Sequence, residues 1–162
     1  MTIAHTAPDE DPPSVAAQIE ALRDKLGSQV TILAHHYQRD GVVAHSDHRG
    51  DSLELSRIAA KATSPYIVFC GVTFMAETAA VLCNPDQTVL QPAGDAPCPM
   101  ARMVDRPALQ EAWDALSEMW ADDLIPITYQ NATADVKAFV GEHGGAVCTS
   151  SNAGALFRWA LR

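Results

Sequence analysis

Two histidines and a tyrosine follow one another at His35, His36 and Tyr37. An imidazole and a phenol can each act as a general acid or base, and an unperturbed histidine changes its charge near neutral pH. His35 and Tyr37 are therefore candidates for a proton-transfer pair. The alternative is a structural role, which is the commoner one for a single histidine.

A second polar stretch contains His45, Asp47 and His48, and imidazoles and carboxylates are common ligands of transition metals. The three residues stand in a polar loop, and their spacing does not fix a coordination geometry. We therefore do not predict a metal site there.

The chain has four cysteines, Cys70, Cys83, Cys98 and Cys148, and none of them forms a CxxC pair. Their spacing alone predicts no metal site, and without a secretory signal reduced thiols are expected rather than disulfides. Cys98 stands in a proline-rich loop, where a thiolate can reach a metal or a cluster; the alternative is a surface thiol. For the other three, burial or helix termination is the favoured interpretation.

The elements that must position these residues alternate along the chain. Short β-branched runs predict five strands, and apolar residues at helical spacing predict helices around them. This alternation predicts an α/β fold, in which parallel sheets form three-layer α/β/α sandwich units. The expected strands are Val30–Ala34, Tyr66–Cys70, Thr88–Leu90, Leu124–Tyr129 and Ala146–Cys148, and the expected helices are Val15–Leu26, Ser52–Lys61, Phe74–Leu82, Ala108–Trp120, Thr133–Gly141 and Ser151–Leu161.

Polar residues follow these strands at their carboxyl ends. In open α/β sheets ligands bind outside the carboxyl ends of the strands, so the distribution predicts a pocket at that edge. The residues in question are His35, Tyr37, Gly71, Cys98, Tyr129, Asn131, Thr149 and Ser150.

Ser52, Asn131 and Ser150 stand near the starts of predicted helices. Free backbone N–H groups and the helix dipole favour an anion there, such as a carboxylate or a phosphate. The simpler interpretation, which we prefer for any one of the three, is a helix N-cap. Asp51, three residues before Glu54, predicts a capping box as well.

The bulk composition narrows the function classes. The formal net charge is −9 and the chain has only 11 Lys and Arg, which argues against nucleic acid as a partner. No apolar stretch approaches the ~20 residues of a membrane span, so we expect no membrane partner and a cytoplasmic location.

Residues 1–14 are acidic and proline-rich and predict a disordered leader. The proline-rich Pro92–Met103 predicts a boundary between one α/β unit over 15–97 and a second over 98–162.

Six short blocks, taken together and in this order, resemble the quinolinate synthase family. Each block alone is a weak motif, whereas the ordered set is specific. The blocks are ILAHHYQ at 32–38, GDSLELS at 50–56, VFCGVTFMAE at 68–77, NPDQTVLQP at 84–92, TYQN at 128–131 and CTSSNA at 148–153.

The resemblance implies a fold and a reaction. It implies three similar α/β/α units around a pseudo-threefold axis, with one cysteine from each unit holding a central [4Fe–4S] cluster. One iron of such a cluster stays open as a Lewis acid. The implied reaction condenses iminoaspartate with dihydroxyacetone phosphate to quinolinate, in the biosynthesis of NAD, and would make the chain part of an iron–sulfur transferase.

The same resemblance implies roles for individual residues. His35 and Ser52 match positions that hold iminoaspartate, and Tyr37 matches a proton-transfer tyrosine. Cys98 matches the first cluster ligand. Tyr129 and Asn131 match a YxN element, and Ser150 matches the first serine of TSSNA; all three are expected to bind substrate.

Three departures from the family pattern qualify these expectations. Ala96–Pro97 replaces an Ala-Gly pair before Cys98, and Glu142–Gly145 resembles a small insertion. The chain also ends at Arg162, inside the second unit, so we expect two cluster cysteines and the phosphate-side residues to be absent and the isolated chain to be inactive. Ala155–Leu161 would then expose apolar surface and favour association.

Three interpretations remain open. The chain is a truncated quinolinate synthase that works with its missing C-terminal half or as a homo-oligomer, a noncatalytic remnant that binds a dicarboxylate, or a structural domain.

Overall fold

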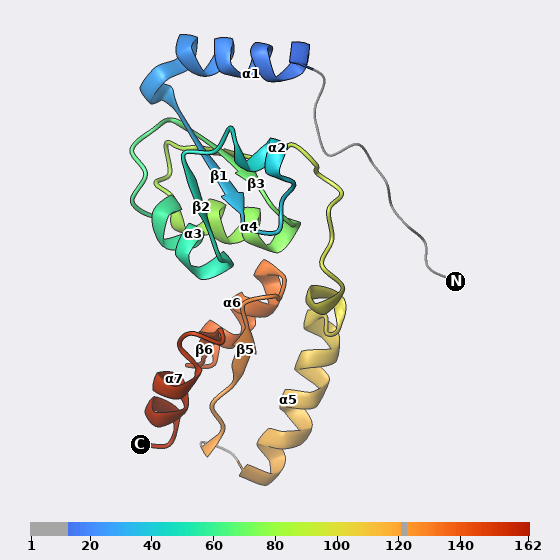
Figure 1. The fold of residues 1–162 in the computed structure, drawn as a ribbon. Helices are drawn as coiled ribbons and strands as arrows, with labels where there is room; N and C mark the ends of the chain where they lie inside the picture. Colours follow the sequence, from blue (N-terminus) through green and yellow to red (C-terminus); the bar gives the residue numbers. More distant parts are fainter. Residues whose placement is uncertain (1–12, 121–122) are drawn as a thin grey trace, which may run out of the picture. The chain divides into compact units, whose positions relative to one another are not determined.

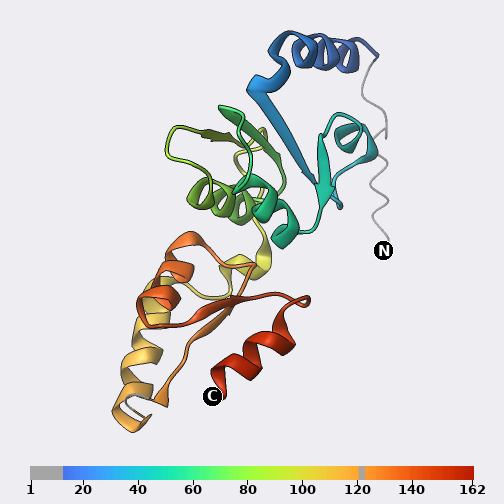
Figure 2. The same cartoon turned by 90° about the vertical axis from the view of Figure 1, so that its left-hand side faces the viewer.

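The computed structural model describes residues 13–120 and 123–162, and Figures 1 and 2 show the chain from two sides. The chain divides into two compact units, Met1–Asp95 and Ala96–Arg162. In both units parallel strands are flanked by helices, so the predicted α/β class is confirmed. No helix in the described part of the chain is long and apolar enough to cross a membrane.

The first unit contains a four-stranded parallel sheet in the order β2-β1-β3-β4. Its strands are β1 Val30–His35, β2 His48–Gly50, β3 Tyr66–Cys70 and β4 Thr88–Leu90. The central pair β1 and β3 is in register from Val30 opposite Tyr66 to Ala34 opposite Cys70. All four strands therefore end at one edge, to which β1 contributes His35.

The core of the first unit lies between the sheet and two helices, α3 Ser52–Ala59 and α4 Thr73–Leu82, which lie side by side in Figure 1. β3 contributes Ile67 and Phe69, while Leu55 and Phe74 come from the helices, and all four are nearly inaccessible to solvent. Full burial of such side chains contributes about 1.5–3 kcal/mol each, so this contact anchors the loops that carry polar residues.

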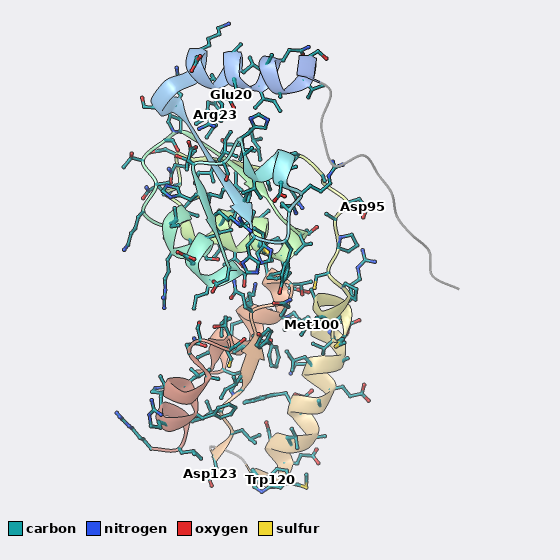
Figure 3. All side chains as sticks on the ribbon, in the orientation of Figure 1. Glu20, Arg23, Asp95, Met100, Trp120 and Asp123 are labelled. Atoms are coloured by element: carbon teal, nitrogen blue, oxygen red, sulfur yellow. The ribbon has the colours of Figure 1, made fainter. Side chains whose placement is uncertain are left out.

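Helix α1, Pro13–Leu26, and η1, Gly27–Gln29, lead into β1. The side chain of Arg23, labelled on α1 in Figure 3, donates to Oδ1 of Asp47 at 2.6 Å, and Oδ2 of Asp47 accepts from the backbone N–H of Ile32 at 2.7 Å. Nδ1 of His45 lies 2.5 Å from Oε1 of Glu20. These bonds join α1 to the polar stretch His45–His48, which therefore has a structural role.

Three elements of the first unit were absent from the sequence prediction, η1, α2 Asp40–Val43 and β2. β2 pairs with β1 from Leu33 opposite His48 to His35 opposite Gly50. Its three residues, His, Arg and Gly, carry no β-branched side chain, and His48 and Arg49 are exposed, so the usual strand signal is missing.

The second unit contains a two-stranded parallel sheet, β5 Ile127–Tyr129 beside β6 Ala146–Cys148. The surrounding helices are η2 Pro99–Arg102, α5 Arg106–Trp120, α6 Ala134–Glu142 and α7 Ala153–Ala160. Tyr129 stands opposite Cys148, so the residues after both strands share one edge.

The segment Glu142–Gly145, predicted to resemble an insertion, ends α6. Gly144 has φ +71°, a conformation that favours glycine, and the N–H of Gly145 donates to the carbonyl of Val140 at 2.8 Å. A Cβ on Gly145 would lie 2.0 Å from the carbonyl oxygen of Pro126, so only glycine lets the chain enter β6 beside the residue before β5.

Helices α5 and α6 meet through aromatic and charged side chains. The ring of Phe139 stacks on His143 at 4.1 Å between centroids, and Trp113 lies 4.5 Å from the same imidazole. Arg106 lies over the Phe139 ring and pairs with Glu142 at 2.6 Å. These contacts fix α6, whose amino end faces the segment after β5.

Several predicted boundaries differ from those of the structure. β1 is one residue longer than predicted and includes His35, β5 begins at Ile127 rather than Leu124, and α7 begins at Ala153 rather than Ser151. Of the predicted leader, residues 1–12 lie outside the described part, and residues 13 and 14 belong to α1. Phe157 and Trp159 of α7 and its C-cap residue Leu161 are exposed, and association through them stays a prediction.

Candidate active site

His35 is the last residue of β1 and is only 7% exposed. The strand fixes its backbone, and the neighbouring N–H of His36 donates to the carbonyl of Gly50 at 3.1 Å, which ties the ends of β1 and β2 together. The imidazole is therefore held by the sheet itself rather than by a loop.

The environment of His35 favours the neutral form of its imidazole. Burial lowers the pKa of His35 first, the nearby His36 lowers it further, and the carboxylate of Asp51 acts in the opposite direction. The backbone N–H of Tyr37 donates to Nδ1 at 3.3 Å, which assigns the proton to Nε2. A neutral imidazole with Nε2–H can donate one hydrogen bond to an anionic oxygen.

Tyr37 lies two residues beyond β1 and is 84% exposed. Its ring meets His35 edge-on at 4.8 Å between centroids and His36 at 4.3 Å. The structure therefore brings the two predicted proton-transfer residues together. The exposed phenol is accessible to a bound molecule.

Ser52 is the first residue of α3, directly after Gly50 and Asp51. Oδ1 of Asp51 accepts from the backbone N–H of Leu53 at 2.9 Å and from that of Glu54 at 2.8 Å, so the predicted cap at Asp51 is confirmed. Because β2 ends at Gly50, Ser52 belongs to the same carboxyl edge as His35.

The cap interpretation that we preferred for three predicted site residues is wrong in each case. The N-cap positions of α3, α6 and α7 belong to Asp51, Thr133 and Asn152. Ser52, Asn131 and Ser150 stand one to two residues away from those positions. Their polar side chains are therefore available for roles other than capping.

Tyr129 and Ser150 form a pair at the edge of the second unit. The phenol oxygen of Tyr129, at the end of β5, lies 3.0 Å from the hydroxyl oxygen of Ser150, which follows β6 by two residues. Both residues are exposed. Two adjoining hydroxyl groups can bind a carboxylate or another oxyanion at this edge.

The turn that carries Ser150 is built by its neighbours. Oδ1 of Asn152 accepts from the backbone N–H of Thr149 at 2.6 Å, and Nδ2 of Asn152 donates to the carbonyl of Val147 at 3.2 Å. The hydroxyl of Thr149 bonds that of Ser151 at 2.8 Å. Ser150 is thus presented by a turn that its own side chain does not stabilise.

Cys98 and Asn131 form the second pair in this unit. Nδ2 of Asn131 donates to Sγ of Cys98 at 3.5 Å, a normal length for a sulfur acceptor, and lies 3.9 Å from Sδ of Met100. Cys98 is half-buried. One soft ligand with a hydrogen-bond donor at its sulfur fits one thiolate of an iron–sulfur cluster.

The remaining cysteines have other surroundings. Cys148 is buried at the end of β6, and burial raises the pKa of the Cys70 thiol at the end of β3. Cys83 follows α4 as its C-cap residue. Within residues 13–120 and 123–162, no three His, Cys, Asp or Glu side chains come together as a metal site.

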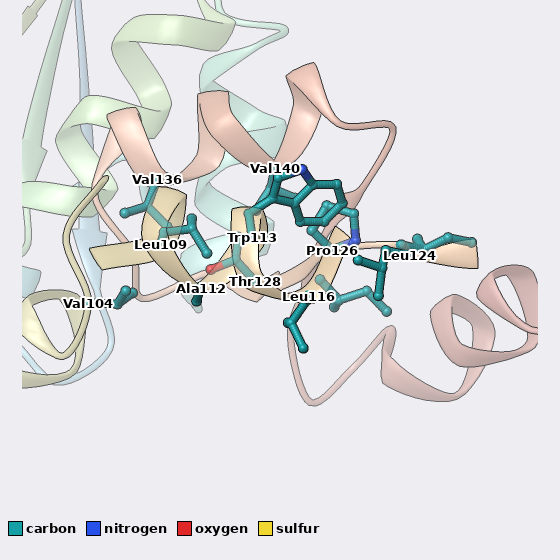
Figure 4. Close-up of a pocket in the computed structure, with 12 residues that line it drawn as sticks. Val104, Leu109, Ala112, Trp113, Leu116, Leu124, Pro126, Thr128, Val136 and Val140 are labelled. Atoms are coloured by element: carbon teal, nitrogen blue, oxygen red, sulfur yellow. The ribbon is translucent and has the colours of Figure 1, made fainter. Parts of the chain in front are cut away.

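A pocket of about 280 Å³ lies elsewhere in the second unit, among residues of α5, β5 and α6 (Figure 4). Its walls are apolar and include Leu109, Trp113 and Val140. None of the predicted site residues lines it. Its chemistry suits an apolar group and does not match the polar edge that the sequence predicts.

Two contributors to the site were not predicted as such. Met100 shares the amide of Asn131 with Cys98, and Asp51 acts on the pKa of His35 in addition to capping α3. The proline-rich loop gave no signal for Met100, since only the folded chain brings it to β5. For Asp51 the capping pattern predicted a role at the start of α3. Its effect on the pKa of His35 depends on the pairing of β2 with β1, which the sequence did not predict.

Comparison with known proteins identifies the relatives of this chain. The family model described as quinolinate synthetase A protein matches residues 17–162. A quinolinate synthase of Herpetosiphon aurantiacus is 55% identical over 146 residues, which cover 88% of this chain and 39% of that protein. The quinolinate synthase of Bacillus subtilis is 49% identical over 145 residues, or 89% of this chain and 39% of its own length.

A third relative gives the same result. The quinolinate synthase of Halobacterium salinarum is 46% identical over 159 residues, which cover 95% of this chain and 42% of that protein. The chain therefore spans about two fifths of the length of the curated relatives that it matches.

Proposed function

Because this chain belongs to the quinolinate synthetase A family, we propose that it forms part of a quinolinate synthase and carries substrate-binding and catalytic residues of that enzyme. The observation that supports the proposal most strongly is the family match over residues 17–162. The proposed reaction joins iminoaspartate to dihydroxyacetone phosphate and releases phosphate and water as the pyridine ring of quinolinate closes. This step belongs to the biosynthesis of NAD.

His35 and Ser52 bind the carboxylates of iminoaspartate in this proposal. The neutral His35 donates from Nε2–H, and its low exposure shields that bond from water. Ser52 adds a hydroxyl donor in the first turn of α3, where the helix dipole favours an anion. The two groups orient a dicarboxylate without placing a second charge beside it.

Tyr37 moves the proton during ring formation. Its hydroxyl is exposed, and its ring rests edge-on against both His35 and His36. A phenol in this place can give a proton to a leaving oxygen and take one from carbon or nitrogen as the condensation proceeds.

Tyr129 and Ser150 bind an oxyanion of substrate with their paired hydroxyl groups, and Asn131 lies between this edge and Cys98. Both hydroxyls can rotate, so each can donate to a carboxylate or phosphate oxygen while the 3.0 Å contact keeps them in place.

Cys98 is the proposed ligand from this chain to a [4Fe–4S] cluster. When bound, an open iron of that cluster would supply Lewis acidity to substrate oxygens. In this proposal two further thiolates come from residues outside 1–162 or from another chain. A protein that contains residues 1–162 together with those thiolates is called the complete enzyme. Reduced thiols of this kind favour a cytoplasmic enzyme.

A noncatalytic dicarboxylate-binding protein is the second candidate. The observation that favours it is that Cys98 is the single predicted cluster ligand of the chain. Such a protein would retain the hydrogen-bond donors of both edges and bind a dicarboxylate without catalysing a reaction. The isolated 162-residue chain is expected to be inactive under either proposal.

Adjacent serines offer a matched test. Ser150→Ala removes the hydroxyl that meets Tyr129, whereas Ser151→Ala removes one that meets Thr149. In the complete enzyme we expect Ser150→Ala to lower kcat/KM for quinolinate formation about tenfold or more, because a bond to a charged substrate is lost. Ser151→Ala should change it much less.

Quinolinate is measured by mass spectrometry after mixing the enzyme with the two substrates. Equal effects of the two serine changes would argue against the assigned substrate contact. An unmodified complete enzyme that binds a dicarboxylate but forms no quinolinate would favour the second candidate.

A further inference from the structure

The side chain of Asn131 points its amide nitrogen at sulfur. Nδ2 lies 3.5 Å from Sγ of Cys98 and 3.9 Å from Sδ of Met100. A carboxamide has two N–H donors and one oxygen acceptor, so both of its donors can serve these two sulfurs. The remaining oxygen of Asn131 is then its only group left for another partner.

The backbone holds Asn131 in this position. The N–H of Gln130 donates to the carbonyl of Cys148 at 2.8 Å, which extends the β5–β6 ladder by one bond, and the N–H of Ala132 donates to the carbonyl of Gln130 at 2.9 Å. Asn131 thus sits in a fixed turn at the sheet edge, and its side chain is half-buried.

The loop that carries Cys98 places the cysteine between two prolines. Pro97 and Pro99 flank the cysteine and cannot donate backbone hydrogen bonds, and the carbonyl of Cys98 accepts from the N–H of Ala101 at 3.0 Å as η2 begins. Figure 3 labels Met100 at the start of the second unit, on η2. The amide of Asn131 therefore joins this loop to the end of β5.

We propose that Asn131 is a positioning residue for Cys98: its amide orients the thiolate sulfur toward the cluster and stabilises negative charge on that sulfur. This inference rests on the proposed function, because it requires Cys98 to be a cluster ligand. It assigns to Asn131 a task in the substrate-free enzyme, beyond the substrate contact predicted from the YxN element. Hydrogen bonds to ligand sulfur stabilise the more reduced, more negative state of a cluster and so raise its reduction potential.

The first experiment tests the contact in the 162-residue chain without any cluster. The side-chain amide resonances of Asn131 are identified in a ¹⁵N–¹H spectrum by their loss in Asn131→Ala. We expect Cys98→Ala to shift them clearly and Met100→Leu, which removes the longer contact at similar volume, to shift them less. Unchanged Asn131 resonances in Cys98→Ala would overturn the inference.

The second experiment tests the consequence in the complete enzyme, loaded with iron and sulfide and free of substrate. The reduction potential of the cluster is measured by EPR-monitored titration in wild type, Asn131→Ala and Asn131→Asp. We expect a lower potential in Asn131→Ala, and a larger fall in Asn131→Asp, where a carboxylate of the same shape replaces the donor. Met100→Leu should leave the potential close to that of wild type.

The outcomes separate this inference from the proposed function. If the wild-type complete enzyme binds no iron, the proposed function fails and the inference falls with it. If the cluster forms but its substrate-free potential is the same in all Asn131 variants, the proposed function survives and the positioning role is wrong. Shifted amide resonances together with a lowered potential would support both.

Discussion

The two sheet edges of this chain hold their polar residues in different ways. In the first unit, backbone elements position the side chains: His35 ends a strand of a four-stranded sheet, and Asp51 caps the helix that begins with Ser52. In the second unit, where strands and turns also hold the backbone, the functional side chains contact one another as well, because Tyr129 meets Ser150 and Asn131 meets Cys98.

This difference has a consequence for substitutions. At the first edge the sheet and helix that carry the functional groups do not depend on those groups for their stability. Substitutions there should therefore change activity without changing the free energy of unfolding to the same degree. The second edge rests on a two-stranded sheet with close backbone contacts, so small changes there should cost more stability. Four predictions test the contrast, beginning with the largest effect.

Tyr37→Phe should separate activity from stability at the first edge. In the complete enzyme the loss of the phenol should lower kcat by about 10²–10⁴-fold, the usual contribution of a positioned general acid or base. Because Tyr37 is 84% exposed, the unfolding free energy of the Tyr37→Phe variant should differ from that of wild type by less than about 0.5 kcal/mol. Tyr66→Phe, at the amino end of β3, is the matched control. Unchanged turnover in Tyr37→Phe would remove the tyrosine from the mechanism.

Gly145→Ala should destabilise the second unit by about 3 kcal/mol, since the new methyl group would meet the Pro126 carbonyl oxygen at 2.0 Å and force the strands apart. Gly141→Ala is the control, because nothing lies within 4 Å of its Cβ position and alanine is the better helix former, worth about 0.5–1 kcal/mol.

Tryptophan fluorescence measures both glycine variants in the second unit alone, because Trp113, Trp120 and Trp159 are the three tryptophans of the chain. Equal urea midpoints for Gly145→Ala and wild type would show that the second sheet accommodates the added methyl group, contrary to this prediction.

Asp51→Ala should cost the first unit about 1 kcal/mol through the loss of two bonds to the first turn of α3. Asp51→Asn keeps a capping oxygen without the charge, so its stability should stay near that of wild type. Circular dichroism during urea unfolding measures both. A loss of equal size in the two variants would mean that the charge, not the cap, stabilises α3.

The smallest effect concerns pH. Burial lowers the pKa of His35 in the folded chain below the ordinary value of 6.5, so the unfolded chain binds the proton more readily. The stability linked to His35 is therefore complete above about pH 6.5 and is lost as pH falls toward the lowered pKa. His35→Gln should flatten this part of the stability curve between pH 7.5 and 5, measured against wild type. Parallel curves would contradict a buried neutral imidazole.

Much of this architecture follows from the sequence, for identifiable reasons. Tyr66–Cys70 is β-branched and aromatic and was predicted to the residue, and the capping pattern at Asp51 marked the start of α3. β2 could not be predicted, because its residues His48–Gly50 pair through backbone alone at a sheet edge.

The site divides in the same way. Residues at strand ends, such as His35 and Tyr129, follow from the alternation of elements, and the structure brings His35 to Tyr37 and Tyr129 to Ser150. The contact of Asn131 with Cys98 spans 33 residues and depends on where an irregular loop folds back, which no local pattern encodes.

The central claim is that the second edge supplies one cluster thiolate, Cys98, to an iron–sulfur quinolinate synthase. Iron content of the complete enzyme after anaerobic reconstitution tests it most directly, with Cys98→Ser compared against Cys83→Ser, a change at the C-cap of α4. We predict about four irons per chain in wild type and Cys83→Ser, and a loss of the cluster in Cys98→Ser. Full iron content in Cys98→Ser, with undiminished quinolinate formation, would contradict the account.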